Sequence, residues 1–147
     1  MIDRSLIGHA YPPRSITVER GAVAFFARAT GETNPVHFDA RAAHAAGYAD
    51  VVAPATFVFS LNSMAWGDRL WVEDLKVDLS KILHAEQHFE PQGPVVAGDT
   101  LTFVSKITDL YDKKGGALEF VVQETDVSDA AGVMVAKLKT VLAVRHG

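Results

Sequence analysis

The sequence contains no cysteine among its 147 residues. This absence excludes thiolate nucleophiles, thiolate zinc sites and iron–sulfur clusters. The chain must instead rely on a packed core, and at this length folding buries roughly 68–70% of the surface that an unfolded chain exposes. With 48% hydrophobic and 22% charged residues, the composition predicts one compact domain over residues 1–147.

The sequence also lacks an excess of basic residues and any long hydrophobic run. Its 14 Lys and Arg residues stand in mixed order against 18 Asp and Glu residues, for a net charge of −4, which gives no electrostatic reason to expect a nucleic-acid partner. No apolar run approaches the roughly 20 residues that cross a membrane, and Asp3, Arg4 and Pro12-Pro13 interrupt the amino terminus, unlike a signal peptide. We therefore expect no membrane segment and, by default, a cytoplasmic location.

Three helical segments are predicted in the first half of the chain. Residues 19–31 place their apolar side chains on one arc, and residues 39–47 follow Asp39, a good N-cap. Residues 55–66 follow Pro54 in the first turn and are apolar almost all the way round. A helix of that kind must be buried.

The second half of the chain alternates between apolar and polar residues, which is typical of strands. Residues 82–91, 100–130 and 132–146 show this pattern, with turn signals at 113–116 and 128–132. We predict at least four strands joined as hairpins, with another strand near 15–18. The expected fold class is α+β, with an antiparallel sheet of about five strands wrapped around the apolar helix.

Polar groups able to carry acid–base chemistry gather after the first predicted helix. Glu32 and His37 are five residues apart, and Pro35 stiffens the loop between them. One interpretation is a general acid–base pair aimed at one water molecule. The alternative is that Asn34-Pro35 forms a turn, Glu32 is solvated and His37 caps a local carbonyl.

The other histidines carry weaker signals. His84 and His88 lie four residues apart in a predicted strand, so we expect them on one face, packed at the surface or at a dimer interface. A metal site is not expected there, because no third ligand follows at a recognisable spacing. We assign no role to His9, His44 and His146.

Three segments together resemble a known family. TGETNPVHFD, at residues 30–39, is similar to the Gly-Asp-x-Asn-Pro-x-His-x-Asp motif of the MaoC-like, (R)-specific enoyl-CoA hydratase and 3-hydroxyacyl-thioester dehydratase family. VVAPAT at 51–56 resembles the entrance of the family's hot-dog helix, and FEPQGPVVAGDTL at 89–101 its strand–turn–strand. The residue pattern of 82–92 resembles that of mycolic-acid dehydratase subunits and of dehydratase amino-terminal domains.

The resemblance implies a hot-dog fold, edge-to-edge dimers and a hydro-lyase activity. Members add water to trans-2-enoyl thioesters of coenzyme A or acyl carrier protein, or eliminate it from (R)-3-hydroxyacyl thioesters. By this resemblance Glu32 and His37 handle the water, and Asn34, the motif asparagine, is a third catalytic residue. Asp39 caps the next helix. The N–H groups of Ala55 or Thr56 would polarise the carbonyl, as a helix N-terminus can, and no metal or redox cofactor is expected.

The chain departs from the family pattern at two places. Glu32 replaces the usual Asp, and Pro54-Ala55 replaces the common His-Gly at the helix entrance. Pro54 has no N–H, so the donor is Ala55 or Thr56, or else the segment is simply the start of a core helix.

These departures leave a second hypothesis beside the enzyme. It is a non-catalytic, acyl-binding hot-dog subunit that pairs with a catalytic partner. The intact Asn34 to His37 stretch favours the enzyme. A hot-dog thioesterase is disfavoured because residues 55–67 contain no carboxylate, and the motif does not favour an aromatase or cyclase.

Overall fold

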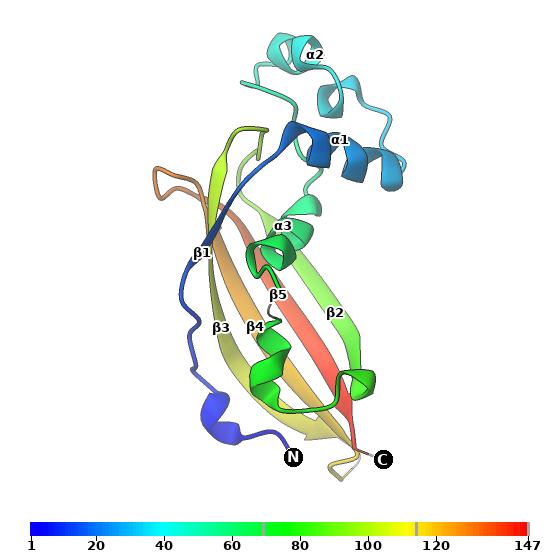
Figure 1. Ribbon diagram of the computed structural model, residues 1–147, viewed down its shortest axis with the longest axis vertical. Helices are drawn as coiled ribbons and strands as arrows, with labels where there is room; N and C mark the ends of the chain where they lie inside the picture. The colour runs from blue at the N-terminus through cyan, green and yellow to red at the C-terminus, as the bar shows by residue number, and fades with distance from the viewer. Residues whose placement is uncertain (69, 114, 147) are drawn as a thin grey trace.

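The structure is a computed structural model that describes residues 1–68, 70–113 and 115–146. Its sheet has five antiparallel strands in the order β1-β3-β4-β5-β2 (Figure 1). The α+β class and the antiparallel sheet of five strands are confirmed, and the first strand lies one residue earlier than predicted. The strands are β1 (Arg14–Thr17), β2 (Ile82–Pro91), β3 (Thr100–Lys113), β4 (Leu118–Ser128) and β5 (Met134–Arg145).

The predicted hairpins are correct for β3, β4 and β5 but wrong for β2. β2 pairs with β5 at one edge of the sheet, while β3 lies between β1 and β4. The connection between β2 and β3 forms hydrogen bonds with residues 51–53 instead of a tight turn. Ala53 N–H donates to Val95 O (2.8 Å), and Ala97 N–H donates to Val51 O (2.9 Å). The β2–β3 connection therefore crosses the end of the sheet and holds the segment that leads into the central helix in place. The predicted turn at 113–116 includes Lys114, which lies outside the described residues.

The prediction that His84 and His88 share a face is also wrong. The β2–β5 register shifts between His84 and Glu86, so that His84 pairs with Leu142 and His88 with Lys139. Leu142 and Lys139 are three residues apart on β5 and point to opposite faces. A bulge is the physical cause, because one extra residue reverses the alternation.

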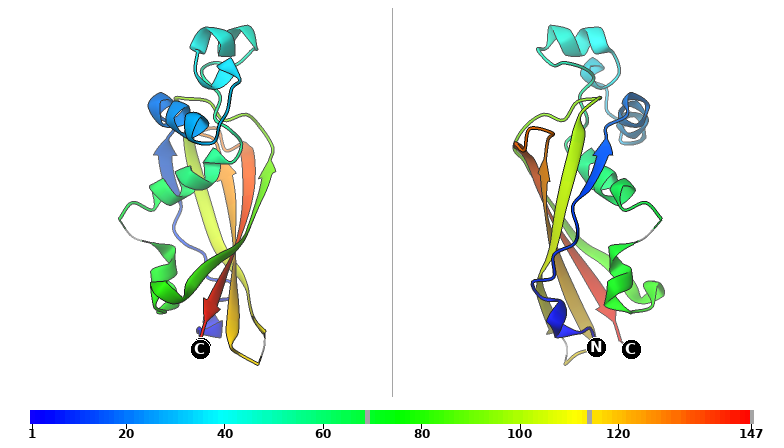
Figure 2. Two further views of the ribbon diagram at one scale, coloured as in Figure 1. Left: turned by 90° about the vertical axis from the view of Figure 1, so that its right-hand side faces the viewer. Right: turned by 60° about the vertical axis from the view of Figure 1, so that its left-hand side comes forward.

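The helices are α1 (Arg20–Ala29), α2 (Ala40–Ala45) and α3 (Phe57–Ala65). α3 lies across the concave face of the sheet, and α1 and α2 sit together at one end, opposite both termini (Figure 2). None of the helices in the described residues is long and apolar enough to cross a membrane. Short 3-10 helices are η1 (Arg4–Leu6), η2 (Pro35–His37), η3 (Trp71–Leu75) and η4 (Leu79–Lys81).

The central helix is shorter than the predicted 55–66. Thr56 is its N-cap and Trp66 its C-cap. Pro54 was expected in the first turn but precedes the helix, and Phe57 N–H donates to Pro54 O at 2.9 Å. Proline therefore closes a turn ahead of α3, which leaves Ala55 and Thr56 as the residues at the helix entrance.

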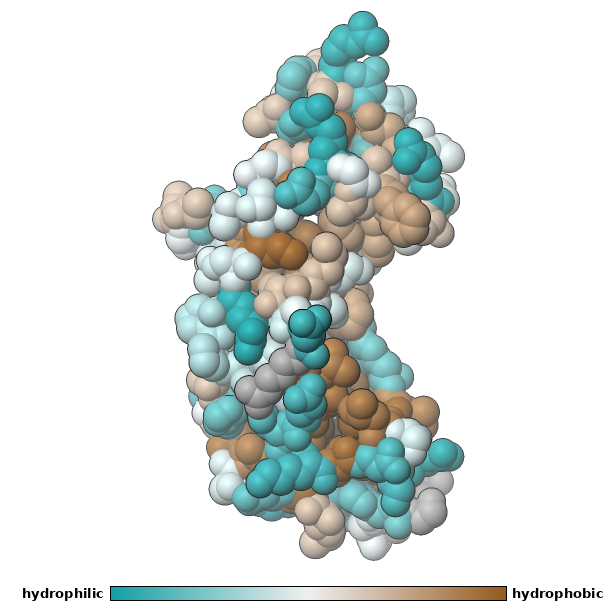
Figure 3. Space-filling view, in the orientation of Figure 1, coloured by the Kyte–Doolittle hydropathy of each residue, from teal (hydrophilic) through white to brown (hydrophobic). Residues whose placement is uncertain are grey.

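Two apolar clusters fill the space between α3 and the sheet. One surrounds the first turns of α3, and the second lies at the far end, below Trp66. Apolar side chains reach the surface at that far end, where Figure 3 shows them as a brown area. The buried residues of the far cluster are Ile2, Tyr11, Trp66, Leu75, Ile107, Leu110, Val121 and Val144.

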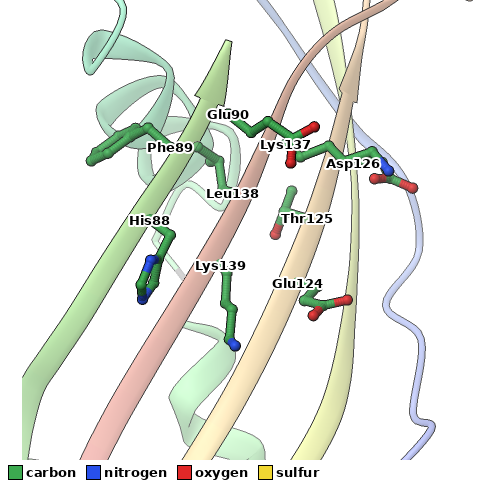
Figure 4. A pocket seen from close by; sticks show the side chains of 9 residues that line it. All are labelled: His88, Phe89, Glu90, Glu124, Thr125, Asp126, Lys137, Leu138 and Lys139. Carbon is green, nitrogen blue, oxygen red and sulfur yellow. The ribbon is translucent and has the colours of Figure 1, made fainter. Parts of the chain in front are cut away.

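The opposite face of the sheet carries charged side chains. Figure 4 shows them along β2, β5 and β4. The strand register sets Glu124 beside Lys139 and Asp126 beside Lys137, which are cross-strand pairs of opposite charge. The register therefore sets opposite charges across from one another on this face of the sheet.

Candidate active site

The end of α1 fixes the position of Glu32. Gly31 adopts a φ of +78°, a left-handed conformation that glycine reaches without steric cost. Glu32 N–H then donates to Ala27 O at 2.8 Å. The backbone of Glu32 is thus bonded to the last turn of α1, and its carboxylate stands just beyond the helix.

Asn34 organises the next turn through its side chain. Its Oδ1 accepts from Val36 N–H at 3.2 Å and caps η2, with Pro35 in the first turn. Asn34-Pro35 therefore forms a turn, as one of the two sequence interpretations held. Asp39 likewise caps α2 by accepting from Arg41 N–H at 2.8 Å, as predicted.

The structure brings Glu32 and His37 together. His37 Nε2 lies 3.9 Å from Glu32 Oε2. The His37 side chain is 13% exposed and the Glu32 side chain 42% exposed. The pair therefore lies near the surface, with the imidazole more buried than the carboxylate.

A backbone carbonyl selects the tautomer of His37. Its Nδ1 lies 2.6 Å from Val52 O, and a carbonyl can only accept, so Nδ1 carries the proton. In the neutral ring, Nε2 is then an acceptor and faces the carboxylate. Sequence reasoning missed Val52, because a backbone carbonyl leaves no signal in residue type.

Further contacts tie the loop to the entrance of α3. Val52 N–H donates to Val36 O at 2.9 Å, and the rings of Phe26 and Phe57 lie 4.8 Å apart. These contacts place the Glu32–His37 pair beside the segment that leads into the central helix.

An ion pair at the surface braces the same segment. Arg20, the first residue of α1, donates Nε–H to Asp50 Oδ1 at 3.1 Å. The hydrogen bond from Arg20 holds the pKa of the Asp50 carboxyl below its ordinary value. The pair joins the start of α1 to the residue that precedes Val51.

Ala55 and Thr56 are exposed and stand at the helix entrance. In the parts of the chain that the structure describes, their N–H groups donate to no other protein group. Ala55 and Val58 line a cavity of about 330 Å³ between α3 and the ends of β2 and β5, which also includes Tyr48, Pro91, Val135 and Ala136. Free donors at a helix N-terminus can bind an oxygen on which negative charge develops.

Comparisons with known proteins identify the family of this chain. A family model described as "FAS1-like, dehydratase domain region" matches residues 5–138. A "UPF0336 protein" of Streptomyces griseus is 39% identical over 145 residues, covering 98% of this chain and 95% of that protein. A "UPF0336 protein" of Clavibacter michiganensis is 43% identical over 128 residues, covering 87% and 85%.

Solved structures give the same picture. The HadBC (3R-hydroxyacyl-ACP dehydratase) complex of Mycobacterium tuberculosis contains a chain with 31% identity and a TM-score of 0.78, covering 94% of this chain and 96% of that one. A MaoC-like dehydratase shares 33% identity with a TM-score of 0.84, covering 97% of this chain but 43% of the other. The PhaJ1 hydratase of Pseudomonas aeruginosa, at 20% identity, TM-score 0.72 and coverages of 96% and 83%, shows the fold alone.

Proposed function

The chain belongs to the FAS1-like dehydratase family, and from that premise we propose that it hydrates trans-2-enoyl thioesters and dehydrates (R)-3-hydroxyacyl thioesters. The predicted resemblance to MaoC-like dehydratases and the hot-dog fold are confirmed, which supports a hydratase or dehydratase function in general. The substrates and the roles of individual residues are the proposal.

The observation that carries the proposal is the gap between Glu32 and His37. At 3.9 Å the two groups are too far apart for a direct hydrogen bond, and both are acceptors when Glu32 is ionised. A water molecule between them has two hydrogens to donate, one to each. The same water keeps a lone pair free for attack on carbon.

The proposed reaction follows from this placement. Glu32 takes one proton as the water oxygen attacks the β carbon, and the hydrogen held by His37 Nε2 stays on the new hydroxyl. The electron pair of the double bond moves toward the thioester oxygen, where the N–H groups of Ala55 and Thr56 stabilise the charge. Glu32 then returns its proton to the α carbon, which restores the enzyme, and the reverse sequence eliminates water. This scheme uses protein groups only and calls for no metal or redox cofactor.

The open edge of β2 supports an oligomer. Among the described residues, β2 pairs with β5 and with no strand on its other side, and an edge strand of this length offers unpaired backbone groups to another strand. Among the structural neighbours, HadBC and ChsH1-ChsH2 are complexes of different subunits. We propose that this edge pairs with a second copy or with another hot-dog subunit. The cytoplasmic location stays a prediction.

The test is hydration of crotonyl-coenzyme A by the purified protein, followed as loss of enoyl absorbance. His37→Ala should lose at least about a hundredfold in kcat, the lower contribution of a general acid–base group. His44→Ala is the matched control, because His44 Nε2 also bonds a carbonyl, Ala49 O at 2.8 Å, but belongs to α2. It should retain full activity.

Glu32→Asp tests whether the longer side chain of Glu32 places its carboxylate correctly to act as the base. A faster Asp variant would mark Glu32 as an imperfectly placed base, since small displacements of a catalytic group can cost about a hundredfold. Equal rates for the wild type and His37→Ala would refute the roles assigned here. No turnover by any sample, even with longer enoyl thioesters, would favour the acyl-binding subunit instead.

A further inference from the structure

A second cavity lies on the same side of α3 as the first, at the far end of the helix. The first cavity includes Val58 and Ala136, and the second includes Asn62 and Thr140. Both are therefore bounded by α3 and β5, and they follow one another along the helix. From Thr56 to Trp66 the helix rises about 15 Å, so the second cavity lies within reach of a chain that starts at the helix entrance.

The far cavity has a volume of about 230 Å³ and mostly apolar walls. Phe59, Trp71, Val72 and Leu142 are among its lining residues. It has an unusual polar component, because Asn62, Trp66 and Gln123 also line it and are only 6%, 5% and 1% exposed.

Three residues that line this cavity each have one buried side-chain polar atom without a hydrogen-bond partner among the described residues. These atoms are Asn62 Oδ1, Trp66 Nε1 and Gln123 Nε2. Asn62 and Trp66 are four residues apart and so share one face of α3, while Gln123 reaches the cavity from β4. Buried groups of this kind normally have partners, and each missing partner is costly.

The three atoms amount to one acceptor and two donors. A hydroxyl group has one hydrogen to donate and two lone pairs to accept, which is the complementary set. A carbonyl would leave Asn62 Oδ1 unsatisfied, and a carboxylate would do the same while burying a charge. The apolar walls favour a hydrocarbon chain around that hydroxyl.

We propose that the far cavity binds a hydroxyl group carried near the distal end of an acyl chain. This inference rests on the proposed function, because it takes the thioester to lie at the entrance of α3. The chain would run along α3 and β5 and place its hydroxyl among Asn62, Trp66 and Gln123. The preferred substrates are then hydroxylated acyl thioesters rather than plain ones.

The chain contains its own probe for the test, since Trp66 and Trp71 are its only two tryptophans and both line the cavity. Tryptophan fluorescence would be titrated with saturated acyl-coenzyme A thioesters of increasing length, each with and without a terminal hydroxyl. Saturated thioesters have no double bond to hydrate, so binding is read without reaction. We expect one chain length at which the hydroxylated thioester binds about tenfold tighter, or about 1.4 kcal/mol.

Asn62→Leu should abolish that preference and leave binding of the plain thioester unchanged or tighter. Ser63→Ala is the matched control, because Ser63 lines the same cavity but is exposed and donates to Phe59 O at 3.2 Å. It should keep the preference. An unchanged preference in Asn62→Leu, or no preference at any length in the wild type, would overturn the proposal and leave ordinary water as the partner of these atoms.

The outcomes separate this inference from the proposed function. Hydration of crotonyl-coenzyme A without a hydroxyl preference would refute the far subsite alone. A hydroxyl preference in a protein that hydrates nothing would refute the enzymatic proposal and keep the subsite as part of an acyl-binding subunit.

Discussion

The two ends of α3 differ in whether the polar side chains near them have hydrogen-bond partners. At the entrance, Asn34 caps a turn and His37 binds Val52 O, so the side chains that shape the loop have protein partners. At the far end, Asn62 and Gln123 are buried with polar atoms that have no partner in the described residues. The first region is shaped by local backbone geometry, whereas the second is the cavity in which we propose that a ligand hydroxyl binds.

Gly31→Ala should produce the largest change in this comparison, and at the entrance only. A left-handed residue other than glycine costs about 1–2 kcal/mol, and no atom of the described residues lies within 4 Å of an added Cβ at this position, so the effect is purely conformational. Stability should fall by that amount, and kcat for crotonyl-coenzyme A by up to about a hundredfold as Glu32 shifts. Urea unfolding and steady-state kinetics measure the two.

Gly21→Ala is the matched control for that change. Gly21 lies inside α1 without a positive φ and also has open space around it. Alanine should stabilise the helix there by up to about 1 kcal/mol and leave kcat unchanged. Equal effects of the two alanines would show that the geometry of Gly31 does not position the loop.

Asn34→Ala should cost about 1 kcal/mol, the usual value of an N-cap. Activity should fall less than in Gly31→Ala, because the backbone bond from Glu32 to Ala27 O is kept. Asn34→Asp, which can still accept from Val36 N–H, should restore most of the stability in the same urea unfolding experiment. Failure of Asp to do so would argue that the amide of Asn34 has a direct role instead.

Asn62→Leu should act in the opposite direction, at the far end. Replacing a buried, unsatisfied amide with an apolar side chain of similar volume removes a desolvation cost. For a gain of about 1 kcal/mol, the midpoint of thermal unfolding should rise by about 2–4 °C, as calorimetry can measure. A lower midpoint would mean that Asn62 already has a partner in the free protein.

Asp50→Asn should give the smallest change, because the Arg20 side chain is exposed and solvent weakens its ion pair with Asp50. The pKa of Asp50 is lowered in the folded protein, so its contribution to stability is present above the ordinary pKa of about 3.9 and is lost as the pH falls through the folded value. The thermal midpoints of the variant and the wild type should therefore differ slightly at pH 7 and converge in acid. A difference that persists in acid would point to packing rather than charge.

Much of the Glu32–His37 loop, beside the start of α3, was predictable from the sequence, because residues close in sequence determine its conformation. Asp39 as a cap, Gly31 as a helix stop and the nearness of Glu32 and His37 all follow from residue types at short spacing. The partners of His37 and Glu32 did not follow, since Val52 O and Ala27 O are backbone atoms. Residue type carries no information about which carbonyl a side chain or an N–H group will meet.

The far end of α3 was not predictable, because it depends on long-range register. The bulge between His84 and Glu86 turns His84 toward Phe59 and leaves His88 on the outer face, and a period-two pattern alone does not reveal it. Gln123 lies in a segment that alternates between apolar and polar residues, and that pattern alone does not place it in a cavity. Only the order of the strands shows that it points beneath α3.

The crossing between β2 and β3 also bears on how the protein folds. β3, β4 and β5 pair through short turns. By contrast, Val18 N–H donates to Asp99 O and Gly98 N–H donates to Val18 O, and these partners are far apart in the sequence. Contacts close in sequence form faster than distant ones. We expect the three-stranded meander to appear early and the Glu32–His37 loop to be assembled last, so that a partly folded chain would already contain most of its sheet while still lacking a site.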